Sequence, residues 1–406
     1  MRVLVVSQYF WPENFRINDL VSGLVERLHE VTVLTGLPNY PSGKLVEGFG
    51  LTGPYRSQFG GAEIVRVPLI PRGNGRALRL VLNYLSFALT ASLLGSWRCR
   101  GPYDVIFVFE PSPITVGIPA RVIAKVKGAP ILFWVQDLWP ESLSATGTIR
   151  SQRILGALAG LVRWVYRGCT MVLVQSEAFV QPILDLGVGV DKIRYFPNSA
   201  EALYQAPLSG QAWAGPSLPT GFRVMFAGNI GAAQSIETML AAAEILRGYD
   251  DIHWIVVGDG RLAPWLKEEV LRRALGDQIH LVGQYPLAAM PAWFAQADLM
   301  LASLRRDPAL ALTIPSKIQS YLACAKPVVA ALDGEGARVV VAAGAGFAVP
   351  AEDAAGLAEA VLKIYEMDAI GRKILGDNGR RYFEKHFDRE KLLDKLEEWL
   401  LEVSRK

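Results

Sequence analysis

The stretch Phe222–Leu246, FRVMFAGNIGAAQSIETMLAAAEIL, decides the class of fold. Its opening run up to Ala227 is mostly apolar and predicts a buried strand, a Gly-Asn-Ile-Gly turn follows, and the apolar spacing after Ser235 predicts a helix. Glycine lets a backbone approach a ligand closely, and the free N–H groups at the N-terminus of a helix attract phosphate. The stretch therefore indicates either a loop that binds a diphosphate or an ordinary strand-to-helix turn.

The same order of strand, turn and helix recurs along the chain. Apolar runs such as Val3–Val6, Val105–Phe109 and Trp254–Val257 are continuous rather than alternating, which is typical of strands covered on both faces. Helix-like segments separate the runs, so we expect parallel sheets with helices on both faces. Proline and glycine accumulate in 204–220, which predicts a linker. The expected organisation is α/β, with two facing Rossmann-like doubly wound domains, 1–203 and 221–375, and C-terminal helices, 376–406, that pack back toward the first domain.

The composition excludes several classes of protein. The chain has 406 residues, of which 51% are hydrophobic and 20% are charged, so it can bury large cores and is not disordered. A net charge of +3 gives no reason to expect a nucleic acid as a partner. The three cysteines are far apart and the four histidines have no ligand spacing, so neither a disulfide framework nor a metal cofactor is expected. The run Val3–Val6 is too short for a signal peptide, and a cytoplasmic location fits these observations.

One apolar segment suggests contact with a membrane. Ala77–Trp97 has Arg79 as its only charged residue, and its length is close to the roughly 20 residues that span a bilayer. It also carries several serines, an asparagine and a threonine, and Arg72 and Arg76 precede it. We therefore favour a helix at the membrane interface, with its arginines on anionic headgroups, over a spanning helix. A core helix of the first domain is the alternative.

Glycine-rich or cationic turns also follow other strands of the second half. The turn 258–261, Gly-Asp-Gly-Arg, follows an apolar run, although its aspartate could simply cap the next helix. Lys317 falls in the first turn of a helix that begins at Pro315 and Ser316, a position that the helix dipole disfavours unless an anion is bound. A third turn, 334–338, reads Gly-Glu-Gly-Ala-Arg. Because the carboxyl ends of parallel strands share one edge, we expect these turns to form one phosphate-binding edge.

Polar and aromatic residues follow the strands of the first half. Such residues fill four loops, 8–19, 36–44, 110–117 and 136–142. Aromatic rings beside amides and carboxylates suit the faces and hydroxyls of sugars. The carboxylates Glu110 and Asp137 end two strands and would point toward a ligand; a helix cap or a structural hydrogen bond is the alternative for each.

A series of motifs over nearly the whole chain resembles one known family. From the N-terminus they read SQYFWPE, LTGLPNYPSGK, LRLVLNYLSFAL, EPSPITVGIPA, DLWPES, VLVQS, IRYFPN, AGNIGAAQ, VGDGR, IPSKIQSYLA and GEGAR. With these motifs in this order, the chain resembles family 4 glycosyltransferases, and within them the WbuB-like group of O-antigen and exopolysaccharide biosynthesis. The resemblance implies a GT-B fold, a nucleotide-sugar donor in the second domain, an acceptor in the first, and transfer with retention of configuration.

The resemblance also assigns candidate residues to three sites. The donor-binding residues that it implies are Gly228, Asn229, Gly231, Gln234, Gly258, Asp259, Gly260, Arg261, Pro315, Ser316, Lys317, Ser320, Glu335, Gly336 and Arg338. The acceptor-binding residues are Glu13, Asn14, Arg16, Asn39, Tyr40 and Ser112. The catalytic candidates are Glu110, Gln136 and Asp137. Gln136 stands where relatives often have a histidine and would hold a hydroxyl of the donor sugar, and Asp137 would orient the sugar or the acceptor.

The chain departs from the family where the donor diphosphate is held. Asn229 and Gln234 stand where many members have an arginine and a lysine, and two glutamates that many members carry are also missing. The WbuB-like group shares most of this departure. We therefore expect backbone amides near Ser316, together with Lys317 and Arg338, to balance the diphosphate charge.

The resemblance implies an activity. We expect transfer of a sugar, an N-acetylated amino sugar in our hypothesis, from a UDP-linked donor to a polyprenyl-diphosphate-linked saccharide in surface polysaccharide biosynthesis. The enzyme would lie at the inner face of the plasma membrane. The alternative is a GT-B nucleotide-sugar 2-epimerase, which needs neither the PNYPSG loop nor a membrane-facing segment. A solute-binding protein would need export, and a dinucleotide-dependent dehydrogenase would need a full Gly-x-Gly-x-x-Gly at the first strand, which is missing.

Overall fold

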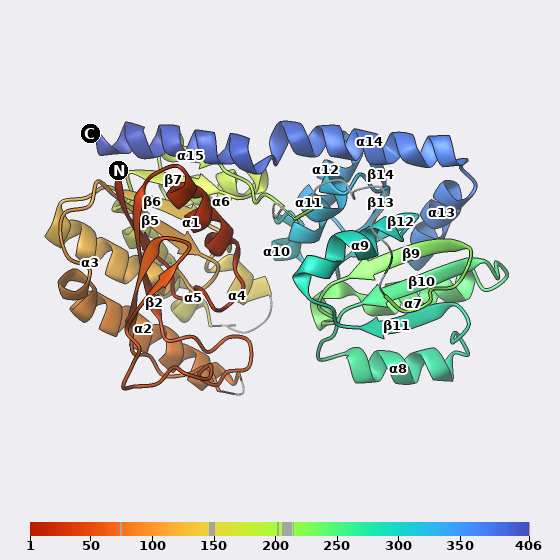
Figure 1. The fold of residues 1–406 in the computed structure, drawn as a ribbon, viewed down its shortest axis with the longest axis horizontal. Helices are drawn as coiled ribbons and strands as arrows, with labels where there is room; N and C mark the ends of the chain where they lie inside the picture. The colour runs from red at the N-terminus through yellow and green to blue at the C-terminus, as the bar shows by residue number, and fades with distance from the viewer. Residues whose placement is uncertain (74, 146–150, 201–202, 205–212, 214, 406) are drawn as a thin grey trace. The chain divides into compact units, whose positions relative to one another are not determined.

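Two sheets, each covered by helices, organise the chain (Figure 1). The computed structural model describes residues 1–406 apart from 74, 146–150, 201–202, 205–212, 214 and 406. The described chain forms two units: unit 1 is Met1–Pro197 with Glu390–Lys406, and unit 2 is Asn198–Arg389. The predicted α/β class with two Rossmann-like, doubly wound domains is confirmed. About half of the predicted linker, 204–220, namely 205–212 and 214, lies outside the described residues.

The sheet of unit 1 has eight strands in the order β3-β4-β2-β1-β5-β6-β7-β8. The strands are β1 (Arg2–Val6), β2 (Glu30–Gly36), β3 (Arg56–Phe59), β4 (Ala62–Val67), β5 (Val105–Glu110), β6 (Ile131–Val135), β7 (Met171–Val174) and β8 (Ile193–Tyr195). Neighbours pair in parallel, except that β3 and β4 form an antiparallel pair at the edge. β5 and β6 are buried along their whole length, which explains why they are continuously apolar up to Glu110.

The helices of unit 1 follow the strands in alternation. They are α1 (Arg16–Glu26), α2 (Ala77–Arg98), α3 (Gly117–Lys127), α4 (Glu141–Ala145), α5 (Gln152–Arg167), α6 (Val180–Asp185) and α15 (Arg389–Ser404), with short 3-10 turns η1 (Ile114–Val116), η2 (Glu177–Phe179) and η3 (Val190–Lys192). α3 ends at Gly128, whose φ of 70° is the left-handed conformation that glycine adopts without strain. α2 packs against α3 and the β4 side of the sheet.

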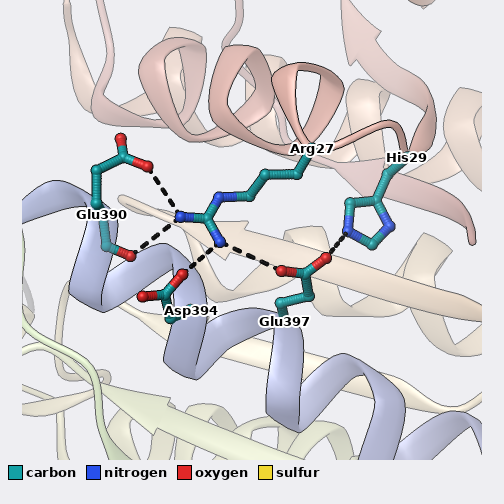
Figure 2. Close-up of polar contacts among 5 residues, drawn as sticks. All are labelled: Arg27, His29, Glu390, Asp394 and Glu397. Carbon is teal, nitrogen blue, oxygen red and sulfur yellow. Dashed lines mark hydrogen bonds and ion pairs between the residues drawn. The ribbon is translucent and has the colours of Figure 1, made fainter.

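The last helix, α15, completes the core of unit 1. Its buried residues Leu392, Leu393, Leu396, Leu400 and Val403 share a hydrophobic cluster with β1, α1, β5 and β6. Figure 2 shows the polar contacts beside this cluster: the Arg27 guanidinium pairs with Glu390 at 2.8 Å, Asp394 at 2.6 Å and Glu397 at 3.2 Å, and His29 Nε2 lies 2.9 Å from Glu397. The acidic partners Glu390 and Asp394 are exposed, and such ion pairs contribute little, so the apolar stripe carries most of the packing energy.

The sheet of unit 2 has six strands in the order β11-β10-β9-β12-β13-β14, all parallel. The strands are β9 (Phe222–Ala227), β10 (Ile252–Val257), β11 (Ile279–Gly283), β12 (Leu299–Ser303), β13 (Val328–Ala331) and β14 (Gly346–Val349). Two hydrophobic clusters cover the two faces of this sheet. The order reverses between β9 and β12, and ligands of open α/β sheets bind at such switch points, outside the carboxyl ends of the strands.

The helices of unit 2 include α14, which the sequence analysis grouped with the last helix of the chain. They are α7 (Ile236–Ile245), α8 (Ala263–Arg272), α9 (Met290–Ala295), α10 (Pro308–Ala311), α11 (Ser316–Ala323), α12 (Glu335–Ala342), α13 (Ala354–Tyr365) and α14 (Ala369–His386), with 3-10 turns η4 (Ala232–Gln234) and η5 (Leu287–Ala289). α14 packs on α11, where a Cβ at Gly376 would lie 2.1 Å from the carbonyl oxygen of Ala325. The C-terminal helices predicted as one group therefore divide: α14 stays with unit 2, and α15 packs on unit 1.

Helix α2 has one packed face and one exposed face. Asn83, Phe87, Ala88, Ala91 and Gly95 are buried, and a Cβ at Gly95 would lie 2.8 Å from Leu34. The opposite face exposes a stripe of large apolar side chains, Leu78, Val81, Leu82, Leu85, Leu89, Leu93 and Trp97. Among the described residues α2 is the helix long and apolar enough to cross a membrane, with 22% of its most apolar window buried. The buried face fits the expectation of a core helix, and contact of the exposed face with a membrane stays a prediction.

Candidate active site

The glycine turns after β9 and β10 pack backbone against backbone. A Cβ at Gly258 would lie 1.9 Å from the carbonyl oxygen of Gly228, and Gly258 has a φ of 147°. A Cβ at Gly260 would lie 2.4 Å from Asn229 Oδ1. The amide of Ile230 donates to the carbonyl of Asp259 at 2.9 Å, which ties the two turns together. Side chains are excluded at these glycines, so the backbone itself forms the surface at the carboxyl edge of the sheet.

Lys317, in the first turn of α11, lies beside the glycine turn after β9. Its Nζ donates to Gln234 Oε1 at 2.5 Å and lies 4.1 Å from the centre of the Phe226 ring. A Cβ at Gly228 would lie 3.5 Å from this Nζ. Burial removes water from the ammonium group and lowers the pKa of Lys317 to about 7. No carboxylate within the described parts of the chain pairs with this lysine, so a bound anion would be its natural counter-charge.

The turn before α12 packs against the residues that precede α11. A Cβ at Gly334, which has a φ of 74°, would lie 1.9 Å from the carbonyl oxygen of Ala311, and a Cβ at Gly336 would lie 2.9 Å from Pro315. Glu335 and Arg338 form a two-pronged ion pair, with Nε and Nη2 at 2.9 and 2.8 Å from the two carboxylate oxygens. Arg338 was predicted to balance a diphosphate, but in this structure Glu335 already neutralises much of its charge.

Two other predicted donor residues have structural hydrogen bonds. Ser320 lies on the buried face of α11, where its hydroxyl donates back to the carbonyl of Ser316 at 3.4 Å, and its contact with a donor stays a prediction. Asp259 Oδ1 accepts a hydrogen bond from the amide of Gly260 at 2.7 Å and shapes the turn. Asn229 and Arg261 are exposed at the turns, and Gln234 is oriented by Lys317.

Arg305 is a cation that the sequence reasoning missed. Its amide donates to the carbonyl of Ala233 at 3.0 Å, and Nη2 lies 3.4 Å from Asp307. The side chain lines a hollow of about 560 Å³ together with Ala232 and Ser235 of the glycine-turn segment. The available signal was a pair of arginines, Arg305 and Arg306, one residue beyond the run 299–303, close to the post-strand position that identified the other turns.

In unit 1 the catalytic candidates lie together at the ends of β5 and β6. The amide of Gln136 donates to the carbonyl of Glu110 at 3.0 Å. Glu110 is fully buried, and burial, together with the nearby charge of Asp137, raises its pKa well above the ordinary value. Neither carboxyl oxygen has a hydrogen bond of good geometry among the described residues, although the amides of Gln136 and Asp137 lie near enough to lower the pKa in part. Burial therefore favours the neutral form of the Glu110 carboxyl.

Asp137 is the ionisable group of this cluster. Burial raises the pKa of Asp137 to about 6, and hydrogen bonds from Ser142, Trp139 and Ser112 oppose the rise. The indole Nε1 of Trp139 donates to Ser112 Oγ at 3.2 Å, so the loops after β5 and β6 contact each other. The structure thus brings Glu110, Gln136, Asp137 and Ser112 together, and leaves Asp137 mostly ionised at neutral pH.

Glu13 and Asn39, predicted to bind the acceptor, hold loops in place. Glu13 Oε1 accepts the amides of Asn39 and Tyr40, both at 2.7 Å, and Oε2 accepts the amide of Phe10 at 3.2 Å. Burial raises the pKa of Glu13 to about 7 in spite of these three amides. Asn39 is fully buried, with its Nδ2 on the carbonyl of Leu37 at 3.0 Å. Both side chains form hydrogen bonds within the protein that position the loops, and their contact with an acceptor stays a prediction.

The remaining predicted residues of unit 1 lie nearer the surface. Asn14 and Tyr40 are exposed, and Arg16 is half-buried at the start of α1. Arg76 and Arg79 are exposed at the start of α2, as a membrane contact requires. Arg72 differs from them: its Nη1 donates to the hydroxyl of Tyr9 at 3.1 Å, and the half-buried side chain belongs to the loop cluster.

The fold and the glycine-lined edge define a class, the GT-B proteins. The Anabaena protein Alr3699/HepE, solved in complex with UDP, superposes with a TM-score of 0.72 over 99% of this chain and 100% of its own, at 16% identity. The GT-B fold predicted from the resemblance is confirmed.

Family models identify the family within this class. Residues 14–199 match the glycosyl transferase 4-like domain, and residues 221–367 match the glycosyl transferases group 1. Each match falls almost wholly within one of the two units. The chain therefore belongs to the group 1 glycosyltransferases of family 4, and the predicted family is confirmed.

Two sequence relatives have comparable lengths. WcaI of Escherichia coli (strain K12), whose name assigns it as a glycosyl transferase to colanic acid biosynthesis, is 26% identical over 80% of this chain and 81% of its own. WbjE of Pseudomonas aeruginosa, named as a glycosyltransferase, is 25% identical over 77% of this chain and 80% of its own.

Proposed function

We propose that the chain transfers a sugar from a UDP-linked donor, with retention of configuration, to a lipid-linked saccharide in the synthesis of a surface polysaccharide. The observation that carries the proposal is the cluster of glycine turns around Lys317. HepE, a protein of the same fold, holds UDP, and the name of WcaI refers to colanic acid biosynthesis. The transferred group that we propose, from the resemblance to the WbuB-like group, is an N-acetylated amino sugar.

The glycine turns provide what a departing diphosphate needs. Without side chains at Gly228 and Gly258, backbone amides can approach phosphate oxygens closely. The first N–H groups of α11 lie beside Lys317, where they add to its charge. A bound diphosphate would raise the pKa of Lys317 from about 7, because an opposite charge favours the ammonium form. These groups would stabilise the negative charge that develops as the diphosphate leaves.

The carboxylate that we assign to the acceptor is Asp137. Being mostly ionised at neutral pH, it can accept a hydrogen bond from a sugar hydroxyl, while the neutral amide of Gln136 holds a hydroxyl of the donor sugar. The neutral form of Glu110, which burial favours, adds no second negative charge. The departing diphosphate would receive the proton of the attacking hydroxyl on the same face, so this mechanism requires no nucleophile from the protein.

We further propose that unit 1 docks peripherally on the inner face of the plasma membrane through α2. The exposed stripe includes Leu78 at 71% exposure, Leu93 at 68% and Trp97 at 70%, and surfaces of this kind enter the lipid interface. Arg76 and Arg79 lie at the start of the same helix, where anionic headgroups would attract them. A lipid-linked acceptor would be reached from this position without leaving the membrane.

Calorimetric titration of the purified protein tests the donor. We expect UDP and UDP-sugars to bind and NAD not to bind. Lys317→Ala should weaken UDP binding about 10-fold or more, since it removes a charge-assisted contact. Lys267→Ala, which removes an exposed lysine on α8, is the matched control and should have no effect. A wild-type protein that binds no nucleotide would refute the proposal.

An assay without acceptor separates the transferase from the 2-epimerase. An epimerase would convert a UDP-sugar to its isomer with no second substrate, whereas the proposed transferase would leave the sugar unchanged until an acceptor is added. The exposed stripe of α2 favours the transferase, because an isomerase of soluble nucleotide sugars has no need of a lipid surface.

A further inference from the structure

Arg72 lies between two aromatic rings on the loop that leads into α2. Its guanidinium carbon is 5.6 Å from the centre of the Tyr9 ring and 5.0 Å from that of Tyr40, and the two ring centres are 5.8 Å apart. Nη1 donates to the Tyr9 hydroxyl at 3.1 Å, and the Arg72 amide donates to Asn39 Oδ1 at 3.0 Å. Phe15 packs on both tyrosines, with ring centres 5.2 Å from each. Backbone and side chain are thus both held in place.

Arg72 has no ionic partner among the residues that the structure describes. Within the part of the chain that the structure describes, no carboxylate forms an ion pair with Arg72. The acid that its charge influences is Glu13, whose two oxygens are already occupied by three backbone amides. A half-buried cation that is fixed by aromatic rings and lacks a carboxylate is suited to an anion from outside, because most donors of its planar fork remain available.

The position of Arg72 connects the proposed catalytic cluster with α2. Tyr84 lies on the second turn of α2, and burial raises its pKa. The charge of Arg72 opposes this rise and the charge of Asp137 adds to it, so both groups act on the same side chain. Arg72 precedes Arg76 by four residues, and the exposed apolar stripe begins at Leu78. An anion held at Arg72 would therefore lie between Asp137 and the face that we place on the membrane.

We propose that the Arg72 guanidinium, held between Tyr9 and Tyr40, binds the phosphate group that links the acceptor saccharide to its lipid. The inference rests on the proposed function and deepens it, since it names the part of the acceptor that is recognised. Guanidinium groups bind phosphate oxygens through two parallel N–H donors, which fixes the distance between the phosphate and the sugar that follows it. Arg72 would thereby set which hydroxyl of the acceptor reaches the reaction centre.

Soluble prenyl diphosphates test this site without knowledge of the saccharide. Farnesyl diphosphate is titrated into the full-length protein, with farnesol and inorganic pyrophosphate as separate arms, in the presence of excess UDP to fill the donor site. We expect farnesyl diphosphate to bind, farnesol to bind far more weakly, and Arg72→Gln to weaken farnesyl diphosphate about 10- to 100-fold. Arg72→Lys keeps the charge but not the planar fork, so its affinity for farnesyl diphosphate should lie between those of the wild type and Arg72→Gln. Arg100→Gln removes an exposed arginine of unit 1 and should bind as the wild type does.

A crossed pair of variants separates this inference from the proposed function. Lys317→Ala should weaken the binding of UDP and leave the binding of farnesyl diphosphate unchanged. Arg72→Gln should weaken the binding of farnesyl diphosphate and leave the binding of UDP unchanged. Loss of UDP binding in the wild type would refute the donor proposal, and farnesyl diphosphate binding that is absent or unaffected by both Arg72 variants would overturn the Arg72 site.

Vesicles distinguish the acceptor phosphate from a lipid headgroup. In sedimentation with phosphatidylcholine vesicles containing phosphatidylglycerol, Arg72→Gln should behave as the wild type, while the double replacement of Arg76 and Arg79 by Glu should bind less. If Arg72→Gln lost vesicle binding as strongly as farnesyl diphosphate binding, Arg72 would be a headgroup contact and the inference would be wrong.

Discussion

The two units build their candidate sites from different materials. In unit 2 the surface is backbone: glycines 228, 258 and 334 bring turns so close that a methyl group at the last two would lie 1.9 Å from a carbonyl oxygen. In unit 1 the surface is made of side chains, with buried carboxyls at Glu13 and Glu110 and a ring cluster around Arg72. A diphosphate offers the same oxygens whatever sugar it carries, so amides suffice to hold it. An acceptor differs from enzyme to enzyme, and side chains are the part of a fold that can change with it.

The largest effect that we expect comes from a variant that disrupts the backbone site of unit 2. Gly258→Ala places a Cβ against the carbonyl oxygen of Gly228 at a φ that alanine rarely adopts, so it should lower the free energy of unfolding of unit 2 by about 4 kcal/mol and abolish UDP binding. Urea denaturation and calorimetry measure the two effects. Gly276→Ala meets open space and should change stability by less than about 0.5 kcal/mol. Equal behaviour of the two variants would show that the close approach is not real.

A pH effect of similar size tests the side-chain site. The pKa of Glu13 is raised from 4.5 to about 7, so the folded state retains a proton that the unfolded chain releases. The resulting stabilisation is complete below pH 4.5 and is lost as the pH rises to 7, by at most about 3 kcal/mol. Glu13→Gln should remove this slope from the pH dependence of unfolding, and Glu47→Gln, at an exposed position, should keep it. An unchanged slope in Glu13→Gln would show that folding does not raise the pKa of Glu13.

Turnover sharpens the comparison, because it depends on both sites while donor affinity depends on one. Asp137→Asn should lower kcat about 100-fold and leave the Kd of UDP unchanged. In the wild type, kcat should fall as the pH drops through about 6, since protonation of Asp137 removes its acceptor capacity. Steady-state kinetics over a pH series measure both effects, with Asp185→Asn, on the surface, as the control. Full turnover by Asp137→Asn would exclude the assigned role.

The smallest effect concerns the helix that closes unit 1. Arg27→Gln removes ion pairs whose acidic partners are exposed, so it should cost about 1 kcal/mol or less. Leu396→Ala, in the buried stripe of the same helix, should cost about 3 kcal/mol. If the two costs were reversed in chemical denaturation, the ions rather than the apolar face would hold α15 in place.

The sequence predicted the backbone site better than the side-chain site, for a physical reason. Glycine turns after apolar runs must fall at the carboxyl edge of a parallel sheet, so Gly228, Gly258 and Lys317 could be brought together from spacing alone. Hydrogen bonds of side chains depend on contacts between distant segments. Nothing local to Glu13 indicates that its carboxylate accepts the amide of Asn39, 26 residues away.

The same limit explains the other differences. Arg72 was grouped with Arg76 and Arg79 because they are neighbours in sequence, yet the rings that hold it come from the loops after β1 and β2. Arg305 was not predicted because its contact with Ala233 joins the segments that follow two different strands, β12 and β9. The amphipathic pattern of 389–404 predicts a helix, but the choice of unit lies in a core that only the folded chain assembles.

The return of α15 to unit 1 imposes an order on synthesis. Unit 2 is contiguous from 198 to 389, so all its residues have left the ribosome while unit 1 still lacks the stripe that begins at Leu392. During that interval the part of this apolar cluster that α15 covers in the complete chain is left open. An N-terminal half expressed alone would stay in that state, exposed to chaperones and proteases, until the last helix is supplied as a separate peptide.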